Sequence, residues 1–246
     1  MPDNYPVLDG EPVEVRSPDA ETWHVLGDLY EAFPSGWVLI GGLMVYLLAA
    51  EAGQEPTRAT ADADVLVRAK VLMKGTIRIA AWLDQHGLEF EGASAMEVGH
   101  RFTRDDVSID LLVQNHLGER AERRTIGQNV APQAVGGASL LASGAVVRVR
   151  TSSGRVVYVP RPSLEAAIVG KAKAASRLED ADRHAQDVAF LLGLVSNPVD
   201  SAELFSASDR RVIVRAGELI DQLGFWRFAN DDQAARAVLR ILSTTT

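Results

Sequence analysis

Residues 37–64 read WVLIGGLMVYLLAAEAGQEPTRATADAD, and this stretch decides the predicted fold. The apolar run at residues 37–40 predicts a short buried strand. A glycine pair follows it, and the largely apolar residues 43–52 predict a helix. Residues 61–68, ADADVLVR, predict a second strand. The order of strand, glycine turn, helix and strand indicates an α/β arrangement in this part of the chain.

Two elements of this stretch carry candidate chemistry. Asp62 and Asp64 are expected on one face of the second strand, because alternate side chains of a strand share a face. Adjacent carboxylates repel each other, and hard divalent cations favour such oxygen clusters. Gly41 and Gly42 bring backbone N–H groups to the start of a helix, where a phosphate chain binds well. A glycine turn or an acid pair alone is ordinary, but the combination predicts a nucleotidyl-transfer site.

A third carboxylate is expected on a neighbouring strand. VSIDLLV at residues 107–113 alternates polar and apolar side chains, which predicts a half-buried strand. It carries Asp110, which could complete a second metal site or act as a base; the alternative is a surface acid in a hairpin. The predicted metal ligands are therefore Asp62, Asp64 and Asp110, for Mg²⁺ or Mn²⁺.

Composition limits the class of protein. The chain has 246 residues and is 47% hydrophobic, which suffices for one large domain or two small ones. No apolar run approaches the roughly 20 residues needed to span a membrane, and no signal-peptide core is visible. There are no cysteines, which excludes disulfides and thiolate metal sites. We therefore expect a cytoplasmic protein without a membrane partner, and the net charge of −8 argues against a protein that coats nucleic acid.

A change of pattern near Pro160-Arg161-Pro162 predicts two domains. Before it, AVVRVR, TSSG and RVVYV predict a hairpin over residues 145–159. After it the pattern is helical, over residues 163–177, 182–194, 207–224 and 231–243. Other expected elements are helices from Ser17 to about Phe33 and over 71–86, and strands at 88–91 and 99–103, whereas 117–142 is ambiguous. The predicted class is α+β, with an α/β domain over 1–160 and a helical domain over 161–246 that completes the active site.

The helical part supplies candidate cations for a triphosphate, whose charge must be neutralised as it develops in the transition state. Lys173 and Arg177 lie at i, i+4 and share a helix face. Lys171 lies about 200° around the helix from Lys173, so the two lysines are not expected to line one site equally. A solvated basic face is the alternative explanation, and the histidines lack the spacing of a zinc site.

A second basic group follows the predicted hairpin. Its members are Arg148, Arg150, Arg155 and Arg161, with Arg120, Arg123 and Arg124 before them. Such arginines could contact the phosphates of a polynucleotide, or they could be an ordinary solvated surface, and the sequence leaves both open.

The motifs resemble a known superfamily. IGGLMVYLLAAEAG, TADADVLV and VSIDLLV resemble the polymerase-β-like nucleotidyltransferases, which implies their sheet with flanking helices. VPRPSLEAAIVGKAKAASR followed by RHAQDVAFLL resembles the AbiEii/MenT-type nucleotidyltransferases, toxins of type IV-like toxin–antitoxin systems. The resemblance covers roughly residues 35–195.

The resemblance also implies roles for single residues. It places Gly41 and Gly42 at the triphosphate-side turn, with Thr60 just before the metal pair. It makes Lys171 the lysine that contacts the nucleotide and Asp187 the acid that closes the site from the helical part.

Other positions qualify this assignment. Lys173 and Arg177 are reserve cations, and Asp110 matches the third strand carboxylate of the wider superfamily. Leu43 follows the glycine pair where the superfamily commonly has a serine that contacts phosphate.

The function that the resemblance implies is Mg²⁺-dependent transfer of a nucleoside monophosphate from an NTP, with pyrophosphate leaving. Members of the branch modify the tRNA acceptor end and so stop growth, which makes tRNA and a cognate antitoxin the expected partners. Two alternatives remain open. A small-molecule enzyme of the antibiotic-modifying type is mildly favoured by the net charge of −8. A non-catalytic nucleotide-binding module is the other.

Overall fold

The computed structural model describes most of the chain. The described ranges are residues 5–16, 20–55, 60–69, 74–92, 100–115, 125, 129–177 and 180–244. The expected helix start at Ser17 lies outside them, as do Arg120, Arg123 and Arg124 of the predicted basic group.

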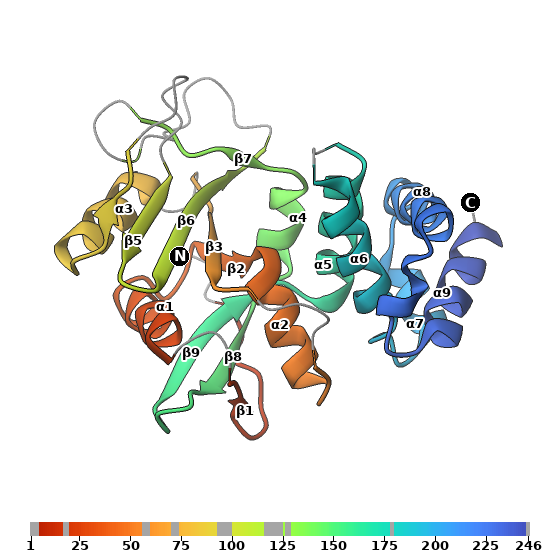
Figure 1. The fold of residues 1–246 in the computed structure, drawn as a ribbon, viewed down its shortest axis with the longest axis horizontal. Coiled ribbons are helices and arrows are strands. Elements are labelled where there is room, and N and C mark those ends of the chain that lie inside the picture. Colours follow the sequence, from red (N-terminus) through yellow and green to blue (C-terminus); the bar gives the residue numbers. More distant parts are fainter. Residues whose placement is uncertain are drawn as a thin grey trace. The chain divides into compact units, whose positions relative to one another are not determined.

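The chain forms two compact units (Figure 1). The first comprises Met1–Leu47 and Ala59–Pro162, and it holds the strands that the structure describes. The second comprises Leu48–Arg58 and Ser163–Thr246, and its described part from Leu164 onward is helical. The sheet, its flanking helices and the helical C-terminal part confirm the predicted α+β class.

The first unit contains nine strands and four helix starts among its described residues. The strands are β1 Val13–Glu14, β2 Trp37–Ile40, β3 Asp62–Val67, β4 Glu89–Phe90, β5 Arg101–Arg104, β6 Val107–Gln114, β7 Gln133–Ala134, β8 Ala145–Arg150 and β9 Val156–Arg161. The helices are α1 Ala20–Ala32, α2 Gly41–Glu51, α3 Gly75–Gln85 and α4 Gly137–Ala142. α2 begins in the first unit and ends in the second.

The larger sheet positions the predicted site residues. Its strand order is β2-β3-β6-β5-β4, and β7 pairs with β6. β3 and β6 are parallel, whereas β2 is antiparallel to β3 and β5 is antiparallel to β6. Figure 1 shows β3, β6 and β5 side by side. All four residues of β2 are buried, as expected for a strand that is apolar on both faces.

The smaller sheet has the order β1-β8-β9, and α1 packs on it. A Cβ atom on Gly27 of α1 would lie 2.6 Å from Cβ of Val157, so the helix approaches β9 closely. Tyr30 stacks on Tyr158 beside this contact, with 5.8 Å between the ring centres. β9 continues through Pro160, beyond the expected end of the hairpin, because an edge strand tolerates a residue without an N–H.

The second unit is a set of capped helices. They are α5 Leu164–Ala175, α6 Ala181–Leu192, α7 Pro198–Leu204, α8 Ala207–Leu223, the 3₁₀ helix η1 Phe225–Phe228 and α9 Asp232–Thr244. Ser163 caps α5 and Ser206 caps α8, each accepting a hydrogen bond from a backbone N–H of the first turn. α7 and η1 were not expected, because such short helices carry too few buried positions for a periodic signal.

Other differences are small. α2 begins at Gly41 rather than after the glycine pair, and α3 begins at Gly75, four residues after its expected start. The ambiguous stretch 117–142 contributes β7 and α4 where it is described. Within the described residues, no helix is both long enough and apolar enough to cross a lipid bilayer.

Candidate active site

Polar side chains form a row across three strands of the larger sheet. Asp62 and Asp64 lie at i, i+2 at the start of β3, so their side chains share a face, and the Asp62 side chain is 53% exposed. The strand register places Asp64 beside Asp110 of β6, and Asp110 opposite Arg101 of β5. The sheet therefore brings the three predicted metal ligands and one arginine to the same surface.

The glycine pair lies against this row. β2 is antiparallel to β3 with Ile40 opposite Asp64, so the chain enters α2 directly beside that carboxylate. A Cβ on Gly41, whose φ is +72°, would lie only 1.7 Å from Asp64 Oδ2. A Cβ on Gly42 would lie 2.9 Å from Thr60 Oγ1. The two glycines thus leave the space that Asp64 and Thr60 occupy, and the structure brings all four residues together.

Arg101 binds two of the carboxylates at this surface. Its Nε donates to Asp110 Oδ1 at 2.8 Å, and its Nη2 donates to Asp110 Oδ2 at 2.7 Å. The same Nη2 lies 3.6 Å from Asp62 Oδ2. The hydrogen bond to Asp110 raises the pKa of the Arg101 guanidinium, although burial opposes this shift. Asp110 is only 6% exposed, so its charge is neutralised by a neighbour rather than by water.

Sequence reasoning missed Arg101, although a signal was present. Residues 105–106 form the two-residue turn between β5 and β6, and this turn fixes the register of the hairpin. The register pairs Arg104 with Val107 and therefore Arg101 with Asp110. Counting outward from the turn could have identified the pair.

A second row lies two residues along the strands. It consists of Asp62 on β3, Ser108 on β6 and Thr103 on β5. Ser108 Oγ is buried, and it has no hydrogen-bond partner among the described residues. A buried hydroxyl without a partner is unusual in a folded protein, and here it adjoins a half-exposed carboxylate.

The donors at this surface fit a hard divalent ion. Asp62 and Asp64 supply carboxylate oxygens, the ligands that Mg²⁺ and Mn²⁺ prefer, and Gly41 leaves room for the Asp64 carboxylate at the start of α2. Among the residues that the structure describes, no group of three or more His, Asp or Glu side chains is arranged to hold a metal ion. The role of Asp110 as a metal ligand stays a prediction.

Two of the predicted cations of the second unit, Lys171 and Lys173, pair with carboxylates within it. Lys171 Nζ donates to Asp187 Oδ2 at 2.6 Å, and these side chains are 7% and 3% exposed. Lys173 Nζ donates to Asp209 Oδ1 of α8 at 2.9 Å. Arg177 follows α5 and is exposed. The structure thus brings Lys171 to Asp187, while their roles toward a nucleotide stay predictions.

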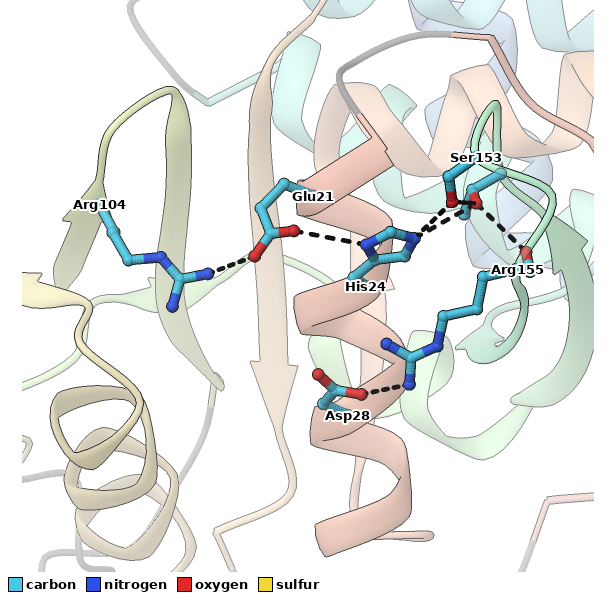
Figure 2. A network of polar contacts seen from close by, with 7 residues as sticks. Glu21, His24, Asp28, Arg104, Ser153 and Arg155 are labelled. Carbon is cyan, nitrogen blue, oxygen red and sulfur yellow. Dashed lines mark hydrogen bonds and ion pairs between the residues drawn. The ribbon is translucent and has the colours of Figure 1, made fainter.

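The hairpin arginines contact other parts of the first unit. Arg150 Nε lies 2.9 Å from Glu14 Oε1, and Arg148 donates to the backbone carbonyl of Gly10. Arg155 pairs with Asp28 of α1, as Figure 2 shows. Two of the seven arginines that were assigned to a phosphate-contacting surface, Arg150 and Arg155, are therefore paired with carboxylates of the chain.

A polar network joins α1 to both hairpins (Figure 2). Glu21 pairs with Arg104 of β5, and its other oxygen lies 3.3 Å from His24 Nδ1. His24 Nε2 lies 3.0 Å from Ser153 Oγ and 3.3 Å from Thr151 Oγ1. The order of carboxylate, imidazole and hydroxyl also occurs in nucleophilic relays. Here the Glu21 carboxylate is paired with Arg104, and the His24 imidazole contacts two hydroxyls. The network therefore stabilises the packing of α1 on the sheets.

Comparisons with known proteins add little at this level of similarity. No protein-family model matches the chain, and no curated protein matches it. One similar solved structure is that of an antigenic nucleotidyltransferase-like protein from Paracoccidioides brasiliensis. It is 13% identical, with a TM-score of 0.46, over 85% of this chain and 92% of that chain. The chemistry of the site has to be inferred from the residues of this chain.

Proposed function

We propose that the chain is a metal-dependent nucleotidyltransferase, which transfers a nucleoside monophosphate from an NTP to an acceptor hydroxyl. The observation that carries the proposal is the close approach of Gly41 to Asp64 and of Gly42 to Thr60. It puts the N-terminus of α2, a place that suits phosphate, beside a carboxylate pair that suits a hard cation.

Four site residues of the first unit have a proposed role. Asp62 and Asp64 hold Mg²⁺ or Mn²⁺, which when bound neutralises charge on the triphosphate. The backbone N–H groups of Gly41 and Gly42 bind phosphate oxygens, because they lie at the N-terminus of α2. Binding in this way orients the NTP so that pyrophosphate can leave when the acceptor oxygen attacks.

The second unit contributes to the proposal through the resemblance. Lys171 is proposed to neutralise phosphate charge and Asp187 to close the site, with Lys173 and Arg177 as further cations. In this structure Lys171 is hydrogen-bonded to Asp187, which keeps its ammonium group in place and compensates its burial.

The proposed acceptor is the tRNA acceptor end, as in the AbiEii/MenT-type toxins that the motifs resemble. A nucleotide added there would block aminoacylation and stop growth, and a cognate antitoxin would be the natural partner. The proposal places this activity in the cytoplasm.

A small-molecule acceptor is the second candidate, and one observation favours it. The hairpin arginines Arg148, Arg150 and Arg155 contact groups within the chain, and the net charge is −8. A cationic acceptor such as an aminoglycoside would suit an acidic protein better than RNA would.

The test is a labelling experiment with each of the four α-³²P-labelled NTPs and Mg²⁺. Total bacterial RNA and an aminoglycoside mixture serve as separate acceptors. Label on tRNA-sized RNA from one NTP supports the toxin proposal, and label on the aminoglycosides supports the second candidate. Nucleotide binding without transfer to either acceptor favours a non-catalytic module, and absence of binding contradicts the whole proposal.

Two variants make the labelling test specific. Asp64→Ala removes a proposed metal ligand, whereas Asp84→Ala removes an exposed acid of α3 that has no proposed role. We expect transfer to be lost only in the Asp64→Ala protein. Transfer by a folded Asp64→Ala protein would rule out the metal assignment.

A further inference from the structure

Arg101 lies between two of the carboxylates that the sequence assigned to metal ions. Its guanidinium donates two hydrogen bonds to the Asp110 carboxylate, of 2.8 and 2.7 Å, and its Nη2 also lies 3.6 Å from Asp62 Oδ2. One fixed cation therefore contacts two of the three predicted metal ligands. Arg101 is itself 38% exposed in its side chain, so it sits at the open surface of the site rather than in the core.

The backbone fixes this arrangement. The two-residue turn between β5 and β6 places Arg101 directly opposite Asp110, where side chains of paired strands meet. A planar guanidinium that binds a carboxylate through two parallel hydrogen bonds is held in orientation as well as in position. Asp110 is 6% exposed, so departure of Arg101 would leave a buried, uncompensated charge. Both facts favour a persistent pair.

A persistent pair changes what Asp110 can bind. A divalent ion at the Asp110 carboxylate would lie beside the Arg101 guanidinium, and the two positive charges would repel each other. Asp62 differs, because its side chain is 53% exposed and its distance to Arg101 is longer than a hydrogen bond.

We propose that Arg101 is a built-in cation of this site, which replaces a second metal ion by neutralising Asp110. Asp62 and Asp64 then hold a single divalent ion, and Asp110 is neutralised by Arg101 instead of binding metal. The inference rests on the proposed function, since it concerns the same carboxylates. Arg101 acts through Asp110 and Asp62, so it is a positioning residue for the reaction.

The experiment counts metal ions directly. The full chain is titrated with Mn²⁺ in the absence of nucleotide, and free Mn²⁺ is measured by electron paramagnetic resonance. The variants are Arg101→Met, which removes the charge but keeps a long side chain, Arg101→Lys, Asp110→Asn and the double variant Arg101→Met/Asp110→Asn.

We expect Arg101→Met to bind one more Mn²⁺ than the wild type, because Asp110 then becomes available to a metal. The double variant should lose that extra ion, and Arg101→Lys should keep the wild-type count. Asp110→Asn should also keep the wild-type count at saturating Mn²⁺, although a higher Mn²⁺ concentration is needed because Arg101 then faces Asp62 without neutralisation.

Two results would overturn the proposal. One is a wild-type ion that disappears in Asp110→Asn, which would make Asp110 a metal ligand. The other is a folded Arg101→Met protein that gains no ion. The comparison of wild type with Asp110→Asn needs no Arg101 variant. It therefore shows whether Asp110 binds metal even if Arg101→Met does not fold.

The failure of the proposed function has a different signature. Asp62→Ala/Asp64→Ala should lose the wild-type ion if these residues hold the metal. Retention of this ion would contradict the proposed function. The Arg101 inference is contradicted by the two results above instead, which concern whether Asp110 binds an ion.

Discussion

Two groups of charged residues that the sequence assigned to catalysis, the pair Asp62 and Asp64 and the pair Lys171 and Asp187, lie in different surroundings. In the first unit, the Asp62 side chain is 53% exposed at the start of β3. In the second unit, the Lys171 and Asp187 side chains are 7% and 3% exposed and form a 2.6 Å hydrogen bond between α5 and α6. The first group can meet a ligand at a surface, and the second is a buried ion pair.

The difference shows that the effect of removing a charged side chain on the free energy of unfolding depends on its burial. A half-exposed acid contributes little to stability, because water solvates its charge. A buried ion pair is different, because removing one partner leaves a charge that neither water nor a neighbour compensates. Substitutions at the first group should therefore change activity, and those at the second should change stability.

The largest effect is expected for Asp64→Ala. Loss of a metal ligand removes several kcal/mol of transition-state stabilisation, so transfer should fall on the order of 10³-fold. The free energy of unfolding should change less than in Asp187→Ala, because Asp64 is partly exposed whereas Asp187 is buried. Steady-state transfer assays and urea unfolding of the same protein check both parts. A large loss of stability would put Asp64 in the class of Asp187.

The next effect is a loss of stability in Asp187→Ala. We expect about 3–5 kcal/mol in urea unfolding, since Lys171 would stay buried without a counter-ion. Asp182→Ala, an exposed acid in the first turn of the same helix, is the matched control and should cost far less. Equal losses in the two variants would contradict the distinction between buried and exposed charges.

The double variant Lys171→Met/Asp187→Leu sharpens the comparison. Replacing a buried ion pair with apolar side chains of similar volume should restore most of the stability that Asp187→Ala loses. Transfer by this folded protein then separates two roles. Normal transfer would limit the pair to holding α5 and α6 together, and its loss would support the predicted role of Lys171 toward the nucleotide.

The third effect concerns Gly41. Gly41→Ala introduces a Cβ at a φ of +72° and only 1.7 Å from Asp64 Oδ2. We expect about 1–3 kcal/mol of destabilisation and a loss of transfer, since the carboxylate must move. Gly53→Ala is the matched control, because Gly53 has a similar φ of +66° but nothing within 4 Å of the added Cβ. A fully active Gly41→Ala protein would count against the proposed geometry.

The smallest effect is a pH dependence at Asp209. Burial alone would raise its pKa, but hydrogen bonds from Ser206 and Lys173 and the charge of Lys173 lower it. A carboxyl with a lowered pKa stabilises the fold fully above its unfolded value of about 3.9, and this contribution is lost as the pH falls through the folded value.

Asp209→Asn should therefore be less stable than the wild type by about 0.5–1 kcal/mol at pH 7, with the difference vanishing at strongly acidic pH. Denaturant unfolding between pH 7 and pH 3 measures it. Lys173→Met should flatten the same dependence, and a difference that grows toward acidic pH would contradict the sign.

Much of the fold could be predicted because its signals are local. The run WVLI gave the bounds of β2, and VSIDLLV gave β6 to within one residue. The longer helices of the second unit carried a periodic pattern, whereas α4, α7 and η1 are too short to do so. The predicted domain division at residues 160–161 stays a prediction.

The sequence by itself determined that Asp62 and Asp64 share a face and that a glycine pair opens a helix after β2, since both follow from a few neighbouring residues. Only the tertiary structure decided that Gly41 lies against Asp64 and that Lys171 is buried against Asp187. These contacts depend on strand register and on burial. Both arise from packing between distant segments, which the local pattern of the sequence does not specify.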